Sequence, residues 1–404
     1  MLTAMRNYYL SQMLSDAGFE VHILTRPSPD LEKFRMDKPI HFHTVDAWDY
    51  RRVLKSLGFP DGVTSSVIRP GKLIEWGFKL LLTYPLNLIF GEGGGWYYRK
   101  AIKTGRSIID KNQISIIYSS YRPITDHFIA SRLKKHHPSL YWIGDFRDIL
   151  WWTRSDRHYQ HAWVQNLLLQ MDQITAITQG IADFWASIVG RPVTTVYNGL
   201  PAIQVDDSVE NKYADRFIIN YTGRIYTQFQ KADCFFTALH ELKNESSDFS
   251  SDLLIHYAGI NKSTWDQWIK THHIDSNSIS EHHQPIHASW QAQNQAQINL
   301  LLTWTTPDVW GFIHGKFNEY VAAGRPILCL IEGDRDPELE ALYQPFSNSI
   351  IVLNQTDQIK AIKKYILDIY QYWKKTGQVP TISKEILSSY AWGIKGEPLL
   401  KLLQ

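Results

Sequence analysis

The alternation of short apolar segments with amphipathic ones, clearest after residue 113, is the feature that most restricts the fold of this chain. The runs ISIIY (114–118), LYWIG (140–144) and ITAIT (174–178) predict buried strands, and helical patterns separate them. Strands that alternate with helices at this spacing form parallel sheets with right-handed crossovers. The sequence therefore predicts an α/β fold with doubly wound sheets.

The length of 404 residues predicts two domains, because one hydrophobic core rarely organises so long a chain. Residues 200–214 lose periodicity and become polar, as interdomain linkers do. Strand patterns then resume in FIINYTG, DLLIHYAG, INLLLTW, PILCLI and SIIVLN. We predict domains over 1–200 and 215–385, with a C-terminal helix at 386–404 that crosses back onto the first domain.

The beginning of the chain is unusual for such a fold. Residues 1–15 predict a helix and FEVHILTR (19–26) a strand, whereas a doubly wound domain normally opens with a strand. We interpret this as an opening strand missing upstream, through truncation or a misassigned start. Residues 27–110 are interpreted as an elaborated helical insertion, and a membrane-surface or acceptor-binding face is the alternative.

Composition excludes several classes of protein. Lys and Arg number 42 against 40 Asp and Glu, a net charge of +2, so no global field attracts nucleic acid. Two cysteines are too few for a disulfide framework, which favours a reducing cytoplasm. The most apolar window, 78–90, contains a proline and is shorter than a membrane span of roughly 20 residues. We expect a cytoplasmic protein.

The segment HGKFNEYVAAGRPIL (314–328) has the pattern of an anion site. Gly315 opens a helix whose first amide groups and dipole favour negative charge. Lys316 adds a cation, and Glu319 projects from the same side, where it can reach ligand hydroxyls. A diphosphate attached to a ribose needs both chemistries. The alternative is an exposed ion pair between Lys316 and Glu319.

In order and spacing, several segments resemble retaining glycosyltransferases of family 4. They are GKFNEYVAAGRPILCL, YTGRIY (221–226), DFRD (145–148), and the stretches 174–199 and 6–26. The resemblance implies the GT-B fold, two Rossmann-like domains that face a cleft. It also implies transfer of a sugar, with retention, from a nucleotide-diphosphate-sugar to an acceptor in surface polysaccharide or lipid-linked glycan synthesis.

The resemblance implies roles in the second domain. Glu319 matches the glutamate that binds the donor ribose, and Gly315 and Lys316 match the phosphate end of the donor helix. One departure stands out: where the family often has a second glutamate near the transferred sugar, this chain has Gly311. Sugar recognition would then use other groups, and Asp308, Trp310 and His314 are the candidates.

Three further residues match the family's diphosphate site. Arg224 and Lys231 match its basic pair, and Gly223 would let the backbone approach the donor. A surface charge is the alternative for Lys231. The resemblance implies a donor held without a metal or another cofactor.

The segment DFRD follows a predicted strand, so Asp145, Arg147 and Asp148 are expected at the carboxyl edge of the first sheet. Arginine cannot act as a base at neutral pH, so Arg147 would act electrostatically. The resemblance implies an acceptor-side or catalytic group at this position, so Asp145 or Asp148 would orient the acceptor hydroxyl or take its proton. The alternative is an Arg–Asp pair that only ties the loop down.

Two other patterns are set aside as metal sites. Asp334 and Asp336 are interpreted as a solvated turn, and the histidine doublets at 136–137, 272–273 and 282–283 as surface residues without zinc spacing. The expected partners are the donor, a glycan or lipid-linked acceptor, and a peripheral contact with a membrane. Two other functions stay open: a nucleotide-sugar epimerase of the same fold, and a non-catalytic nucleotide-sugar-binding paralogue.

Overall fold

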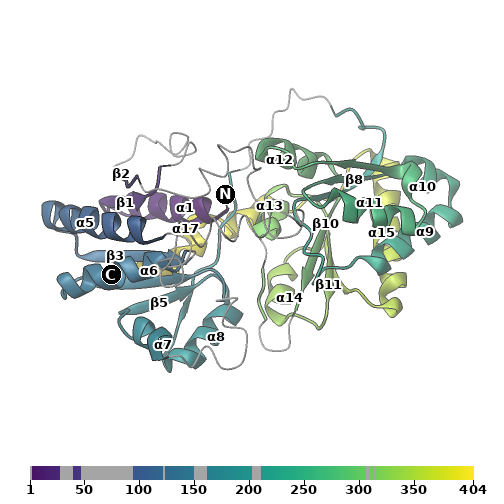
Figure 1. Cartoon of the computed structure of the whole chain (residues 1–404). Helices are drawn as coiled ribbons and strands as arrows, with labels where there is room; N and C mark the ends of the chain where they lie inside the picture. Colours follow the sequence, from purple (N-terminus) through teal and green to yellow (C-terminus); the bar gives the residue numbers. More distant parts are fainter. Residues whose placement is uncertain are drawn as a thin grey trace, which may run out of the picture. The chain divides into compact units, whose positions relative to one another are not determined.

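A computed structural model describes residues 2–27, 40–46, 94–121, 123–149, 162–202, 211–305, 310–313 and 315–404 (Figure 1). The contacts divide the chain into two compact units. Unit 1 comprises Met1–Ile177, Ile181–Tyr197 and Gly396–Gln404, and unit 2 comprises Thr178–Gly180 and Asn198–Lys395. No helix in the described part of the chain is long and apolar enough to cross a membrane.

Unit 1 is built on parallel strands. The order β3-β4-β5-β6 forms one sheet, and β1 pairs with β2 in a second, two-stranded sheet. Its elements are α1 (Leu2–Asp16), β1 (Val21–Thr25), β2 (Ile40–Thr44), α5 (Gly94–Asn112), β3 (Ile116–Tyr121), α6 (Thr125–His136), β4 (Tyr141–Phe146), α7 (Ala162–Leu168), β5 (Gln173–Ala176), α8 (Gln179–Val189), β6 (Thr194–Thr195) and α18 (Glu397–Lys401).

Helix α1 confirms the expected helical start. Leu10 and Met13, three residues apart, are buried on one face, and Gly18 ends the helical segment at a φ of +93°. Only glycine adopts such a backbone angle without strain. Of the predicted insertion at 27–110, the structure describes β2 and α5, and residues 28–39 and 47–93 lie outside the described part.

Unit 2 contains one six-stranded parallel sheet in the order β12-β11-β10-β7-β8-β9. Its elements are β7 (Phe217–Thr222), α9 (Asp233–Glu245), α10 (Ser247–Asp252), β8 (Leu253–Ala258), α11 (Lys262–Thr271), η4 (Asp275–Asn277), β9 (Ser278–Glu281), α12 (Ile286–Gln295), β10 (Ile298–Trp304), α13 (Gly315–Ala322), β11 (Ile327–Glu332), α14 (Pro337–Tyr343), β12 (Ile350–Leu353), η5 (Thr356–Gln358), α15 (Ile359–Thr376), α16 (Lys384–Ser389) and α17 (Trp392–Lys395).

The strand order of unit 2 is that of a doubly wound domain. The chain starts in the middle of the sheet at β7, runs outward through β8 and β9, then returns to pair β10 with the other side of β7. The direction of winding therefore reverses between β7 and β10. Ligands of open α/β sheets bind at such a switch point, beyond the carboxyl ends of the strands.

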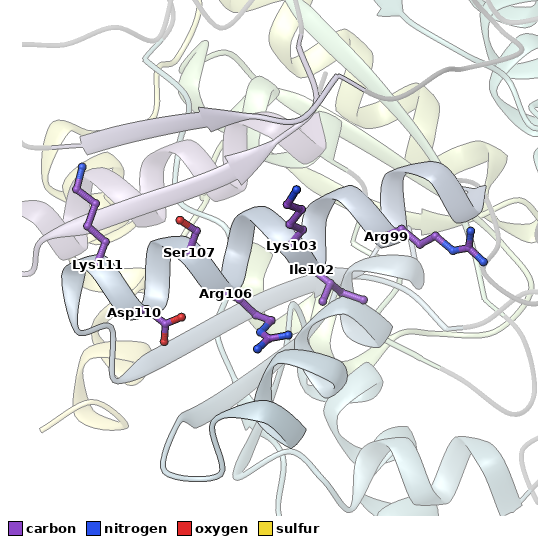
Figure 2. Close-up of a pocket in the computed structure, with 7 residues that line it drawn as sticks. All are labelled: Arg99, Ile102, Lys103, Arg106, Ser107, Asp110 and Lys111. Atoms are coloured by element: carbon purple, nitrogen blue, oxygen red, sulfur yellow. The ribbon is translucent and has the colours of Figure 1, made fainter.

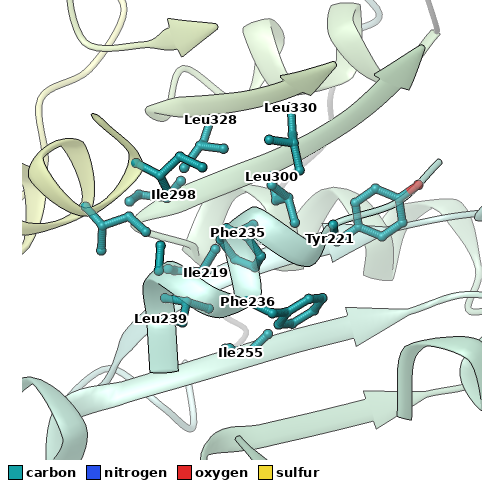
Figure 3. Close-up of a cluster of buried hydrophobic side chains, with 14 of the residues drawn as sticks. Ile219, Tyr221, Phe235, Phe236, Leu239, Ile255, Ile298, Leu300, Leu328 and Leu330 are labelled. Carbon is teal, nitrogen blue, oxygen red and sulfur yellow. The ribbon is translucent and has the colours of Figure 1, made fainter. Parts of the chain in front are cut away.

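Apolar side chains from strands and helices fix this sheet. Figure 3 shows Ile219, Ile255, Ile298 and Leu300 from neighbouring strands beside Phe235 of α9. Every residue of β10 is buried, which is why its sequence is nearly continuous in apolar residues. The predicted α/β architecture is confirmed, although β9 and helices α9 to α12 were not predicted.

Candidate functional site

The expected donor residues of unit 2 surround the switch point of its sheet. Gly223 and Arg224 follow the last residue of β7, and α13, which follows β10, begins at Gly315. Because β7 and β10 are parallel neighbours, the two segments leave the sheet at the same edge. The structure thus brings together residues that are about 90 positions apart in the chain.

Lys316, in the first turn of α13, is the residue that links these segments. Its Nζ donates to the hydroxyl of Tyr221 at 2.5 Å and to the backbone carbonyl of Arg224 at 3.0 Å. It also lies 4.0 Å from the centre of the Tyr221 ring. Burial lowers the pKa of Lys316 to about 7, although the charge of Glu319 acts in the opposite direction.

Gly223 fits against the Lys316 side chain. Its φ is +116°, and a Cβ built on it would lie 2.6 Å from Lys316 Cε. Its carbonyl accepts from the Tyr257 hydroxyl at 3.1 Å. A larger residue would both strain the backbone and displace the amine.

Glu319 lies one helical turn after Lys316 and is half-buried. The amide Nε2 of Gln293, in α12, donates to its Oε2 at 3.1 Å and to Thr222 Oγ1 at 2.8 Å. Burial raises the pKa of Glu319, while Gln293 and Lys316 act against that rise. The carboxylate therefore sits between a cation and an amide at the end of β7.

The remaining two donor residues are placed differently. The side chain of Arg224 is exposed, and only its backbone contacts Lys316. Lys231 is 63% exposed, and its Nζ lies 3.6 Å from Glu332 Oε1 at the end of β11. Lys231 thus has an acidic partner on the same sheet edge, and no contact with Lys316 or Glu319 appears among the described residues.

Asp145 does not have the predicted position. It lies inside β4 rather than after it, with no exposed side-chain surface. Arg6 donates to both carboxylate oxygens at 2.8 and 3.2 Å, and Ser120 and Thr175 donate at 3.0 and 2.8 Å. Burial raises its pKa, but Arg6, Arg147 and the Thr175 hydroxyl together outweigh this and hold the value below normal. Asp145 is a structural ion, so its predicted contact with an acceptor is wrong.

The other two predicted residues of the DFRD segment, Arg147 and Asp148, follow the end of β4. Arg147 is half-buried, and its Nε donates to the carbonyl of Tyr121 at the end of β3. Asp148 Oδ1 accepts from the amide of Ile149 at 2.9 Å. Neither contact is the Arg–Asp pair of the alternative interpretation, and Arg147 is the residue that joins this loop to the end of β3.

Asp126 lies near Arg147 at the carboxyl edge of the unit 1 sheet, and it was not predicted from the sequence. It lies in the first turn of α6, after β3, and accepts from the Tyr97 hydroxyl at 3.2 Å. Burial raises the pKa of Asp126 to about 7, although Tyr97, Arg147 and Arg26 all lower it. The rule that selected Arg147, a polar residue just beyond a strand, would also have selected Asp126.

The structure describes the Asp334–Asp336 turn and the histidine doublets, which were not predicted to bind metal. Asp336 is buried and caps α14 by accepting from the amides of Glu338 and Leu339 at 3.1 Å, so the interpretation as a solvated turn is wrong for it, whereas Asp334 is exposed. Among the doublet histidines, those at 136, 273, 282 and 283 are exposed. Of the proposed sugar-site residues, Asp308 and His314 lie outside the described part.

This chain is similar to known proteins in its structure only. No protein-family model matches the sequence, and no curated protein matches it. Sucrose-phosphate synthase from Thermosynechococcus elongatus has a TM-score of 0.59 at 12% identity, over 98% of this chain and 90% of that one. The Candida albicans trehalose-6-phosphate phosphatase N-terminal domain has a TM-score of 0.58 at 11% identity, over 95% and 96% of the two chains.

A UDP-N-acetylglucosamine 2-epimerase also resembles this chain, with a TM-score of 0.50 at 13% identity, over 95% of each chain. At identities this low the likeness concerns the fold. That fold is GT-B, with two Rossmann-like domains, as the sequence predicted.

The burial of Asp145 leads to a stability prediction. Asp145→Asn leaves the Arg6 guanidinium buried without its counter-ion, so we expect the free energy of unfolding to fall by about 3–5 kcal/mol. Asp148→Asn is the matched control, since an asparagine still accepts in the same turn. Urea denaturation followed by circular dichroism measures both. Equal stability of the two variants would contradict the structural role of Asp145.

Proposed function

We propose that this protein is a glycosyltransferase that takes its sugar from a nucleotide-diphosphate-sugar bound by unit 2. The observation that carries the proposal is the Lys316 amine, held at the β7–β10 switch point beside Gly223 and close to Glu319. A cation at a helix N-terminus suits a diphosphate, and a carboxylate one turn later suits a ribose hydroxyl.

The chemistry of transfer fits this arrangement. Departure of a nucleotide diphosphate leaves negative charge on its phosphate, and fixed donors stabilise that charge without reorganisation. The Lys316 amine has only neutral acceptors, Tyr221 and the Arg224 carbonyl, as hydrogen-bond partners in the described part of the chain. A phosphate oxygen is a stronger partner than either, so the amine would gain most from a bound donor.

Unit 1 would supply the acceptor side of the reaction. Arg147 directly follows β4, and Asp126 lies in the first turn of α6, which follows the neighbouring strand β3. A carboxylate with a pKa of about 7 is poised to take a proton from an acceptor hydroxyl at neutral pH, and a guanidinium beside it can hold an anionic acceptor. We propose retention of the anomeric configuration, as the resemblance to family 4 implies.

A nucleotide-sugar epimerase is the second candidate, since one of the structurally similar proteins is a UDP-N-acetylglucosamine 2-epimerase. The two functions differ in their need for an acceptor. Turnover of a nucleotide-sugar without any acceptor would identify an epimerase, and nucleotide binding without turnover under any condition would identify a binding paralogue.

The cationic surface of unit 1 supports a peripheral contact with an anionic membrane. Figure 2 shows Arg99, Lys103, Arg106 and Lys111 spaced along α5. Arg132, on the adjoining helix α6, and Arg106 both lower the pKa of His136, so both add positive charge around that residue. Each cation near an anionic bilayer contributes about 1 kcal/mol. Such a contact would bring the enzyme to a lipid-linked acceptor at the inner face of the membrane.

The donor site is tested by nucleotide binding. Lys316→Ala should weaken binding of the preferred nucleotide among UDP, GDP and ADP by roughly tenfold to a hundredfold, the loss of one charge-assisted contact. Lys270→Ala, an exposed lysine on α11, is the control. Isothermal titration calorimetry measures both variants, and equal affinities would remove the basis of the proposal.

The pKa of Lys316 adds a pH dependence with a definite sign. In the protein without nucleotide, the Lys316 amine loses its proton above pH 7. A phosphate binds the charged form of the amine, so at higher pH the amine must take up a proton when the nucleotide binds. We expect nucleotide affinity to fall as the pH rises from 7 to 9, with proton uptake on binding, and Lys316→Arg to abolish both effects. Titrations in buffers of different ionisation enthalpy measure the proton uptake.

The acceptor side is tested by Asp126→Asn. We expect kcat to fall by on the order of a hundredfold, the usual contribution of a general base, while KM for the donor changes little. The rise of kcat with pH near 7 should disappear with it. Asp110→Asn, an exposed change on α5, is the control, and a variant that keeps both rate and pH profile would exclude Asp126 as the base.

The membrane contact is tested by vesicle co-sedimentation. Arg106→Glu with Arg132→Glu should weaken binding to vesicles rich in phosphatidylglycerol by at least about thirtyfold, since two cations are lost. The control carries the same charge change in unit 2, at the exposed Lys270 and Lys375. Equal binding of the two double variants, or none by the wild type, would argue against this surface.

A further inference from the structure

Four polar side chains gather on one face of the β1–β2 pair, and none of them belongs to either proposed site. His22 of β1 lies opposite His41 of β2 in the parallel register. Side chains two residues apart share a face of a strand, so Glu20 accompanies His22 and His43 accompanies His41. Imidazole and carboxylate are the ligand types of zinc and its neighbours in the first transition series.

The distances within this group fit a metal site. Glu20 Oε1 lies 3.1 Å from His22 Nε2 and 3.4 Å from His41 Nε2. One potential ligand atom from each of the three residues lies within 4.8 Å of the others. Ligands at about 2.0–2.1 Å from a tetrahedral metal are roughly 3.3–3.4 Å apart, so small adjustments would seat an ion.

His43 occupies the position of an outer partner. Its Nε2 lies 3.0 Å from Nδ1 of His22, the nitrogen that does not face Glu20. A hydrogen bond from the His22 Nδ1–H to His43 Nε2 would fix the tautomer of His22 that leaves its Nε2 available as a ligand. Ligand histidines commonly donate their second N–H in this way, and the bond directs the other nitrogen to the metal.

We propose that Glu20, His22 and His41 bind one divalent metal ion of the zinc class, which joins β1 to β2. Glu20 and His41 are 62% and 50% exposed, so water can reach the remaining coordination position. A two-stranded sheet is marginally stable alone, and a cross-strand ion would stabilise this one. The site shares no residue with the donor or acceptor sites, so it stands or falls independently of the proposed function.

The experiment uses the full chain without an affinity tag. Zn²⁺ is titrated in competition with a chromophoric chelator at pH 7.5, and Co²⁺ absorption reports the coordination geometry. Glu20→Gln and His41→Asn change exposed side chains, so both variants should fold. A double variant, His282→Asn with His283→Asn, is the control for adventitious binding by exposed histidines.

We expect the wild type and the control to bind one Zn²⁺ with equal affinity and to gain thermal stability from it. Each ligand variant should bind at least about a hundredfold more weakly and lose that gain, and His43→Phe should weaken binding by about tenfold or more. Equal Zn²⁺ affinity in the wild type and the ligand variants, or weaker binding in the control alone, would overturn the proposal.

Discussion

The contact of the Lys316 amine with Tyr221 and the Arg224 carbonyl fixes the position of the amine in the proposed donor site. Tyr221 stacks with Tyr257 and Trp265 in the core, so its hydroxyl is fixed by the packing of unit 2. A cation bonded to two neutral acceptors is poorly compensated for its lost hydration, which is why its pKa falls. Without a bound anion, the charged form of this amine is therefore less favourable than that of an exposed lysine.

In unit 1, the burial of a charged side chain separates those that stabilise the fold from those that can contact a ligand. Asp145, inside β4, is neutralised by Arg6 of α1, and the pair joins the helix to the sheet. Arg147, two residues later, is at the end of the strand and only half-buried. Removing two charges from water costs free energy, so the buried Asp145–Arg6 pair is stable only because its members neutralise each other. Arg147, at the end of β4, keeps some contact with water that a ligand could replace.

Strands with a clear hydrophobic pattern could be predicted from the sequence, whereas short, half-buried strands and the exact strand ends could not. The nearly continuous apolar strand β10 was found because burial on both faces leaves a clear signal. Strand β9, with only four residues and a half-buried pattern, leaves little such signal. The helix that begins at Gly315 was predicted correctly, with Lys316 and Glu319 in it, whereas Asp145 was misplaced because strand ends are uncertain by a residue or two.

Gly311 shows how a local backbone requirement limits the chemistry of the site. Its φ is +75°, its amide donates to Asp336 at 2.9 Å, and a Cβ there would lie 2.1 Å from Glu338 Oε2. A glutamate at this position would have to strain the backbone and displace an acidic side chain. The glycine is therefore part of how this segment joins α14. In the proposed glycosyltransferase, recognition of the transferred sugar would depend on groups other than the glutamate of the family that the chain resembles.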